Sequence, residues 1–202
     1  MIINHKYKFI FIHIQKTAGT SITNSLSNLP ETENLHHSHS MINLLNSNEY
    51  EDYFKFCFVR NPFDRLLSWY NMILKKGSHN DWSKYILENS NNFSEFLELT
   101  DIIIERNPLE LQSSVDYPKS ISYNQLDYIT DRLGNIRCDF IGRFENLEND
   151  FYSITNYIGV DIKIKHLNKF EHKPYSEYYN DLDVKLVENL YKRDLEYFNY
   201  KF

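Results

Sequence analysis

The stretch KFIFIHIQKTAGTS, residues 8–21, decides the fold because a short apolar run passes through a turn into a helix-like pattern. The turn holds the only alanine of the chain and one of its five glycines. The same order of strand, turn and helix recurs twice further along. Apolar runs followed by amphipathic segments indicate a parallel sheet with helices on its faces. We therefore predict an α/β fold in a single domain over residues 1–202, with strands at 8–14, 54–60 and 138–144 and helices following them to about 29, 63–76 and 147–158.

Length and composition describe a globular chain with an acidic surface. The 202 residues are 42% hydrophobic and 16% aromatic, which is enough to bury a substantial core. The net charge is −6, whereas proteins that bind nucleic acid through their overall charge are positively charged. Any anionic ligand must therefore be held by a local basic cluster.

The apolar run Tyr7–Ile14 is too short to span a membrane and lacks the cleavage pattern of a signal peptide. Cys57 and Cys138 each lie in an apolar, strand-like run, so we expect buried, reduced thiols, although one disulfide between them is a second reading. These features predict a cytoplasmic protein without stable membrane insertion.

The remaining segments show weaker periodicity. Lys163–Tyr179 has no clear period and is interpreted as a long loop, ordered or closed by a ligand. The last helix offers leucines and a phenylalanine, from Leu182 to Phe198, as its apolar face. Further helices are expected at residues 40–46, 94–105, 123–133 and 181–197.

The loop after the first strand has the composition of an anion cradle. Ala18 and Gly19 are small enough for backbone N–H groups to approach an anion closely. Thr20 and Ser21 can cap the next helix and donate hydroxyl hydrogen bonds, and Lys16 adds a positive charge at the rim. The competing interpretation is a tight turn with Thr20 as the N-cap. A Walker loop is disfavoured, because this loop has one glycine and its lysine precedes that glycine, whereas the Walker lysine follows its glycines.

A second cationic position follows the next strand. Arg60 ends an apolar run and Pro62 is placed to start a helix, so the Arg60 side chain emerges at the carboxyl edge of the sheet. Ser68 lies about two turns into that helix, within reach of a phosphate bound by Arg60. The competing interpretations are a surface ion pair from Arg60 to Asp64 and a structural role for Arg65.

Together these two motifs resemble those of sulfotransferases that use 3′-phosphoadenosine 5′-phosphosulfate (PAPS). Residues 13–21, HIQKTAGTS, resemble the 5′-phosphosulfate loop, and residues 59–62, VRNP, with Arg65 and Ser68 resemble the 3′-phosphate motif. Carbohydrate sulfotransferases of the heparan uronyl 2-O and chondroitin 4-O type, with their bacterial relatives, are the most similar. Residues 139–147 and 190–198 also resemble family blocks, while residues 72–120 are not diagnostic.

The resemblance implies a P-loop-like parallel β-sheet flanked by helices, and it assigns roles to the two motifs. Lys16 would contact the bridging region of the phosphosulfate, while Arg60 and Ser68 would hold the 3′-phosphate. A loop near Lys169, His172 and Lys173 would close over the cofactor. The 5′-phosphate would be wrapped by Thr17, Ala18, Gly19, Thr20 and Ser21.

A histidine cluster lies between the two motifs. His37-Ser38-His39 matches the His-x-His pattern that carries the catalytic base of the uronyl 2-O enzymes, which favours His39, then His37. Other relatives point to His36. A neutral histidine suits removal of a proton from an acceptor hydroxyl, and the scheme needs no metal. A metal site and solvated loop residues are the competing readings.

The predicted function is therefore transfer of a sulfuryl group from PAPS to a hydroxyl, which the resemblance places on a carbohydrate, leaving 3′-phosphoadenosine 5′-phosphate (PAP). A non-catalytic nucleotide- or glycan-binding module and a nucleotide phosphotransferase are the alternatives. No nucleic-acid partner is expected. The acceptor and the oligomeric state stay open at this point.

Overall fold

The computed structural model describes residues 1–35, 42, 49–77, 81–102, 121, 123–165 and 173–202. Contacts within the chain divide it into two compact units. Among the described residues, the first unit holds 1–60 and 125–165, and the second holds 61–102, 121, 123–124 and 173–202. The single domain over residues 1–202 stays a prediction.

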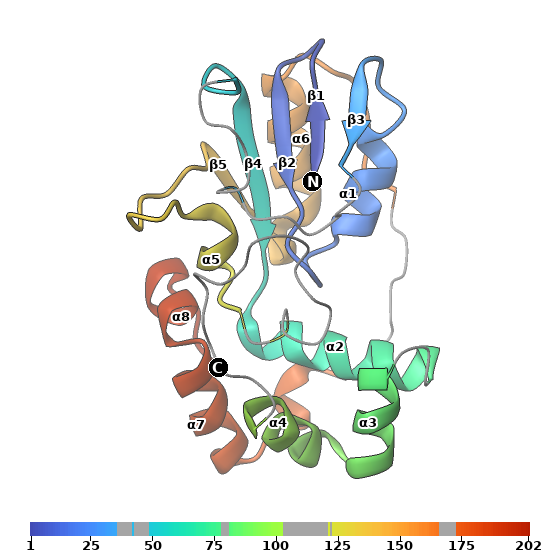
Figure 1. Ribbon diagram of the computed structural model, residues 1–202, viewed down its shortest axis with the longest axis vertical. Coiled ribbons are helices and arrows are strands. Elements are labelled where there is room, and N and C mark those ends of the chain that lie inside the picture. Colours follow the sequence, from blue (N-terminus) through green and yellow to red (C-terminus); the bar gives the residue numbers. More distant parts are fainter. Residues whose placement is uncertain (36–41, 43–48, 78–80, 103–120, 122, 166–172) are drawn as a thin grey trace. The chain divides into compact units, whose positions relative to one another are not determined.

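The first unit is built on a five-stranded sheet in the order β3-β1-β2-β4-β5 (Figure 1). Strands β2, β4 and β5 run parallel, while β1 and β3 are antiparallel at one side. The predicted α/β fold with a parallel sheet is confirmed in this parallel part. The strands are β1 (Ile2–Asn4), β2 (Phe9–Ile12), β3 (Thr32–Asn34), β4 (Phe54–Val59) and β5 (Phe140–Arg143).

One face of this sheet is aromatic. The register pairs Phe9 with Phe54 and Phe11 with Phe56, so these rings lie on one face, because side chains alternate along a strand. Helices α1 (Gly19–Leu26) and α6 (Leu147–Tyr157) pack their apolar side chains against that face. On β5 the face needs a glycine, because a Cβ on Gly142 would lie 2.5 Å from the ring of Phe58. Burial of these rings is the main stabilisation of the first unit.

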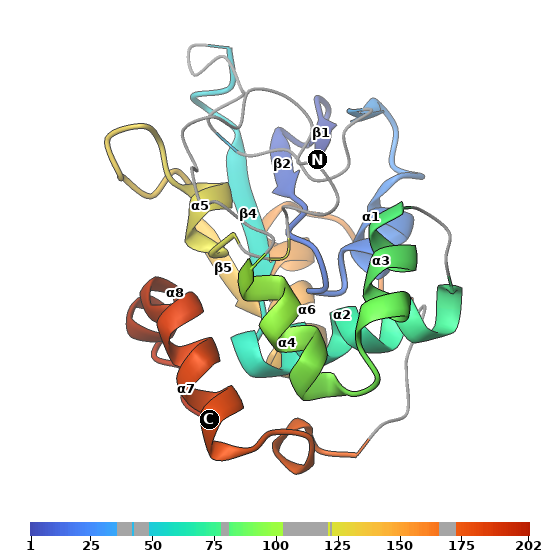
Figure 2. The same ribbon diagram turned by 60° about the horizontal axis from the view of Figure 1, so that its bottom comes forward.

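The second unit is helical. Its helices α2 (Pro62–Lys76), α3 (Asp81–Asn89) and α4 (Phe93–Ile102) contact one another, as Figure 2 shows. Helix α7 (Asp181–Leu190) contacts both α2 and α4, and α8 (Lys192–Phe198) follows it. Their shared core is centred on buried Trp69, Phe96 and Tyr191.

Several expected boundaries differ from the structure. The antiparallel strands β1 and β3 and helix α3 were not expected. Helix α5 (Leu126–Ile129) is much shorter than the expected 123–133, because a turn closes at Asp131–Gly134. The expected helix 181–197 breaks at Tyr191, whose φ of −115° is not helical. Leu182 was expected on the apolar face but is 76% exposed.

The remaining predictions concern the two cysteines, the helix at residues 40–46 and membrane insertion. Cys57 and Cys138 are both free thiols, as predicted, but only Cys57 is fully buried. Burial raises the pKa of the Cys57 thiol. The helix expected at residues 40–46 lies outside the described residues, apart from residue 42. Within the described residues, every helix is too short or too polar to cross a lipid bilayer.

Candidate functional site

The parallel strands bring the two predicted motifs to one edge of the sheet. Ile12 pairs with Cys57 and Val59 pairs with Arg143, so β2, β4 and β5 all end on the same side. The loop from His13 to Ala18 and the Arg60 side chain therefore leave the sheet at its carboxyl edge. Ligands of open α/β sheets bind at this edge.

The backbone of the loop has the alternating geometry of an anion nest. Lys16 has φ 68° and Ala18 has φ 66°, both left-handed, while Thr17 and Gly19 between and after them have negative φ. Such alternation turns successive N–H groups toward one side and forms an anion-binding concavity. Helix α1 starts directly afterwards at Gly19, so its N-terminal N–H groups add to the same positive end.

Gly19 has a structural role beside the close approach to an anion that the sequence predicts, which stays a prediction. Its own φ is not left-handed, so the glycine is not needed for backbone freedom. A Cβ at this position would lie 1.7 Å from Nε2 of His13, which is far inside contact distance. The His13 ring is buried and stacks on Phe11, with ring centroids 5.7 Å apart. The glycine therefore makes room for a histidine under the loop.

The hydroxyl side chains also differ in part from expectation. The N-cap of α1 is Ala18, without a side-chain cap, so the expectation that Thr20 caps the helix is wrong. The Thr17 hydroxyl donates to the Ile14 carbonyl at 2.9 Å, which leaves the Thr17 backbone N–H as its donor toward an anion. Ser21 is buried in the first turn of α1, whereas Thr20 is exposed.

Arg60 is joined directly to the loop. Its Nη1 donates to the carbonyl oxygen of Lys16 at 3.2 Å, and its guanidinium lies 3.9 Å from the centroid of the Phe144 ring. The backbone of Arg60 is held by the Gln125 side chain, which accepts from its N–H at 2.9 Å and donates to its carbonyl at 2.8 Å. A buried amide thus replaces a strand partner just beyond the end of β4. The structure therefore brings the cation of one motif to the backbone of the other.

The rest of the second motif lies in the second unit. Ser68 is buried in α2 at 9% exposure, and its sharing of a ligand with Arg60 stays a prediction. Arg65 is 1% exposed, donates to the Tyr123 carbonyl at 3.0 Å and lies over the Tyr191 ring. Arg65 was expected to be a structural partner of an acidic neighbour; its contacts with the Tyr123 carbonyl and the Tyr191 ring are structural, and the acidic partner stays a prediction. Pro62 starts α2, as predicted.

Asn61 anchors the start of α2. Its Oδ1 accepts from the Phe63 N–H at 3.1 Å, and its Nδ2 donates to the Tyr175 hydroxyl at 3.1 Å and to the Lys201 carbonyl at 2.9 Å. One side chain thus caps the helix that follows Arg60 and ties it to the C-terminal residues. The Asn-Pro pair is a recognisable cap signal in the sequence, but the two long-range partners are not.

Asn61→Ala is expected to lower the thermal midpoint by roughly 6–12 °C, because a lost cap costs about 1 kcal/mol and two lost hydrogen bonds cost about 1 kcal/mol each. Asn61→Asp keeps the oxygen that caps α2 and loses the hydrogen bonds to Tyr175 and Lys201. Its thermal midpoint should therefore fall between those of wild type and Asn61→Ala. Circular dichroism melting measures this order. Equal midpoints for wild type and Asn61→Ala would contradict the anchoring role.

The candidate base lies outside the described residues, since His36, His37 and His39 all fall in the segment 36–41. Lys169 and His172 are also outside the described residues. Lys173 is described and forms an ion pair with Glu177 at 3.2 Å. In the ranges that the structure covers, no group of three histidine, cysteine or carboxylate side chains is placed to hold a metal ion.

The arrangement at the carboxyl edge fits an anionic ligand. The site consists of hydrogen-bond donors, as an anion requires. These donors are the nest of N–H groups at a helix N-terminus, the lysine within the nest and the buried arginine beside it. Comparison with protein-family models finds a match to the sulfotransferase family over residues 1–201.

The chain belongs to the sulfotransferase family.

No curated protein and no solved structure matches the chain, so the assignment rests on the family model. It agrees with the resemblance read from the loop and the Arg60 motif, and with the mixed α/β fold. The family transfers sulfuryl groups to hydroxyl-bearing acceptors, and the assignment supports that activity in general for this sulfotransferase.

The site of this sulfotransferase holds residues that the sequence analysis missed. Gln125, which positions Arg60, lies 65 residues along the chain and carries no local signal. Phe144 was part of a quoted family block, but its place under a guanidinium needs the sheet register. His13 was quoted in the loop without a role. Its contact with Gly19 is visible only once the turn is built.

Proposed function

We propose that this sulfotransferase moves the sulfuryl group of PAPS to a hydroxyl of a carbohydrate by in-line transfer, with a histidine as base. The observation that carries the proposal is the bond from Arg60 to the Lys16 carbonyl, because it joins the two phosphate motifs in one site. PAPS has two separate anionic ends, and the chain offers a separate set of donors for each.

At the 5′ end, the nest at residues 16–19 and the N-terminus of α1 bind the phosphate through backbone N–H groups. Lys16 neutralises charge that develops on the leaving nucleotide. At the 3′ end, the Arg60 fork binds the second phosphate with Ser68. The Phe144 ring and the Gln125 amide keep Arg60 in place before any ligand arrives.

The reaction needs one bond exchanged and one proton moved. PAPS supplies an activated sulfuryl group, and PAP is the leaving product. The acceptor oxygen forms the new bond to sulfur as the bond from sulfur to the 5′-phosphate oxygen breaks. His39, or His37 as the second candidate, takes the hydroxyl proton. No step requires a metal ion.

His39→Ala is expected to lower kcat by about 10²–10⁴-fold, because general-base catalysis contributes on that scale. PAP binding should be unchanged, since the base contacts the acceptor. Transfer of labelled sulfate from PAPS, measured beside a PAP titration, separates the two effects. An active His39→Ala enzyme would move the base to His37 or His36, which the matching alanine variants identify.

The function itself is tested by incubating the chain with labelled PAPS and a panel of hydroxyl acceptors, including free sugars, nucleotide sugars and glycans. Labelled, sulfated carbohydrate is the expected product. Release of PAP without a sulfated carbohydrate, across a panel of that breadth, would contradict the carbohydrate acceptor. Two free thiols support the further proposal that the enzyme works in the reducing cytoplasm, where nucleotide sugars and small metabolites are the acceptors available.

A further inference from the structure

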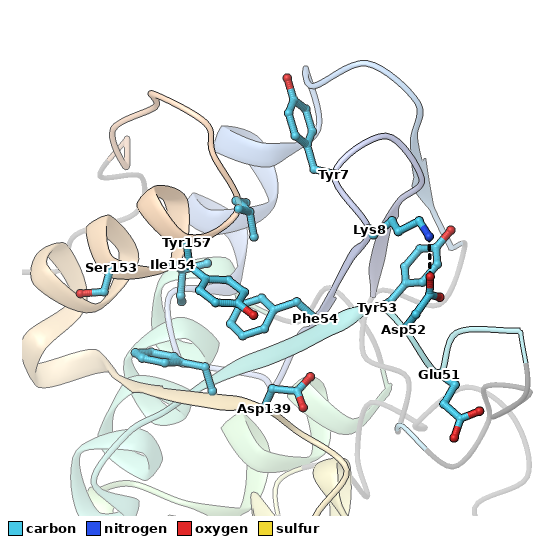
Figure 3. Close-up of a pocket in the computed structure, with 12 residues that line it drawn as sticks. Tyr7, Lys8, Glu51, Asp52, Tyr53, Phe54, Asp139, Ser153, Ile154 and Tyr157 are labelled. Atoms are coloured by element: carbon cyan, nitrogen blue, oxygen red, sulfur yellow. Dashed lines mark hydrogen bonds and ion pairs between the residues drawn. The ribbon is translucent and has the colours of Figure 1, made fainter.

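A pocket lies at the amino edge of the sheet, opposite the carboxyl edge that carries the loop at residues 13–18. It has a volume of about 750 Å³, within the range of pockets that enclose drug-sized ligands. Figure 3 shows its lining, which comes from the residues just before β2, from the residues before and at the start of β4 and β5, and from the C-terminal half of α6 with Ile158 after it. Strand β2 spans four residues, about 13 Å, so this amino-edge pocket is separated from the phosphate loop by the full strand.

The walls of the amino-edge pocket include exposed aromatic rings. Tyr157 on α6 is 71% exposed, and its ring centroid lies 4.4 Å from that of Phe54 at the start of β4. Figure 3 shows the two rings side by side, with Tyr7 across the cavity. The two rings are tilted by 39° and pack against each other, so the exposed Tyr157 ring is the apolar surface that a ligand meets. This ring carries a hydroxyl at its rim, which suits a ligand with an apolar face and polar edges.

The charges of the pocket are mostly negative. Three carboxylates, those of Glu51, Asp52 and Asp139, line it together with one ammonium, that of Lys8. The ammonium is already neutralised, because Lys8 donates to Asp52 in an ion pair. Their hydrogen bond raises the pKa of Lys8 and lowers the pKa of Asp52, so both stay charged. The Lys55 ammonium adds a second positive charge beside the pocket, because its Nζ donates to the Tyr53 carbonyl at 2.8 Å. The three carboxylates still outnumber the two ammonium groups, and this balance favours a cation over a sulfated or uronic acid ligand.

The rim is built before any ligand binds. Asp139 accepts through Oδ2 from the Lys55 N–H at 2.7 Å, and its own N–H donates to the Lys55 carbonyl at 2.7 Å. The Phe54 N–H donates to the Lys8 carbonyl at 2.9 Å. Figure 3 places the Asp139 carboxylate below the Phe54 and Tyr157 rings in that view. A ligand on the rings therefore meets a fixed carboxylate, and fixed groups reduce the entropy cost of binding.

We infer that the amino-edge pocket binds an amino sugar, a pyranose ring that carries an ammonium group. The sugar lies with its C–H face on the exposed Tyr157 ring, and the ammonium is held by Asp139 and by the face of that ring. The inference rests on the proposed function, which supplies a carbohydrate acceptor. The pocket then anchors a part of the acceptor remote from the hydroxyl that receives sulfate.

The test is a ligand-observed NMR titration of the intact chain with glucosamine, glucose, glucuronate and choline. Glucosamine should bind most tightly and glucuronate should not bind. Tyr157→Ala should weaken glucosamine binding about fivefold, because a platform ring and its cation–π contact are lost. Tyr152→Ala is the matched control, since Tyr152 lies on the same helix, is 70% exposed and is not part of the lining.

Asp139→Asn keeps an acceptor for Lys55 and removes the charge, so it should weaken glucosamine binding and spare glucose. Three results would overturn the inference: no glucosamine binding by a chain that PAP still stabilises, glucosamine binding unchanged in Tyr157→Ala, or choline binding as tight as glucosamine. Glucosamine binding that Tyr157→Ala weakens, in a chain that PAP fails to stabilise, would support the pocket and count against the proposed function.

Discussion

The Gly19→Ala variant is expected to unfold roughly 4–10 °C below wild type and to bind PAP at least about tenfold more weakly. The added Cβ occupies space 1.7 Å from Nε2 of His13, whose ring is buried and stacked on Phe11. Either the ring or the start of α1 must move. Because the anion nest ends at Gly19, a shift of α1 also moves the N–H groups of the nest.

Two further variants separate the steric cause from others. His13→Ala combined with Gly19→Ala should be more stable than the sum of the single changes predicts, by about 0.5–3 kcal/mol, because the ring no longer occupies the space. Ala18→Gly removes a Cβ from a left-handed residue and should leave stability unchanged or raise it by up to about 1 kcal/mol. Additive melting data for the double variant would contradict the contact between His13 and Gly19.

Arg60→Ala is expected to weaken PAP binding by roughly 30-fold or more, since removing one partner of a buried charge pair costs about 2–5 kcal/mol. The unliganded chain should unfold within a few degrees of wild type. The backbone at residue 60 stays in place, because Gln125 bonds its N–H and carbonyl groups and these bonds do not depend on the side chain. Isothermal titration calorimetry measures the loss.

The controls for Arg60 test charge against geometry. Arg60→Lys keeps the charge and loses the two-pronged fork, so its PAP affinity should fall between wild type and Arg60→Ala. Arg137→Ala removes the same charge from an exposed position in the first unit and should change affinity less than about threefold. Equal losses in Arg60→Ala and Arg137→Ala would show a general charge effect and contradict a specific site.

Strong local patterns made much of the fold predictable. The parallel strands were recognisable because Phe, Ile and Val follow one another without interruption in β2 and β4, and Pro62 marked the start of α2. Strands β1 and β3 have only three residues each, too few for a periodic signal. Their pairing depends on long-range contacts such as Asn4 Nδ2 donating to the Pro30 carbonyl.

The candidate site was predictable in its motifs but not in its supports. Lys16 and Arg60 stand out as cations directly after apolar strands. The glycine of the loop was interpreted as space for the ligand, which stays a prediction, and the structure adds that it leaves space for His13. The roles of His13, Gln125 and Phe144 depend on three-dimensional contacts that no spacing in the chain encodes. The amino-edge pocket likewise gathers residues from four separate segments.

The central claim is a site for a nucleotide with two separate phosphate groups, and a thermal-shift titration with PAP tests it most directly. PAP should raise the thermal midpoint in a concentration-dependent manner. Adenosine 5′-monophosphate, which lacks the 3′-phosphate, should give a much smaller shift. Lys16→Ala and Arg60→Ala should each reduce the PAP shift. A folded wild-type chain that PAP does not stabilise, or that both nucleotides stabilise equally, would contradict the account.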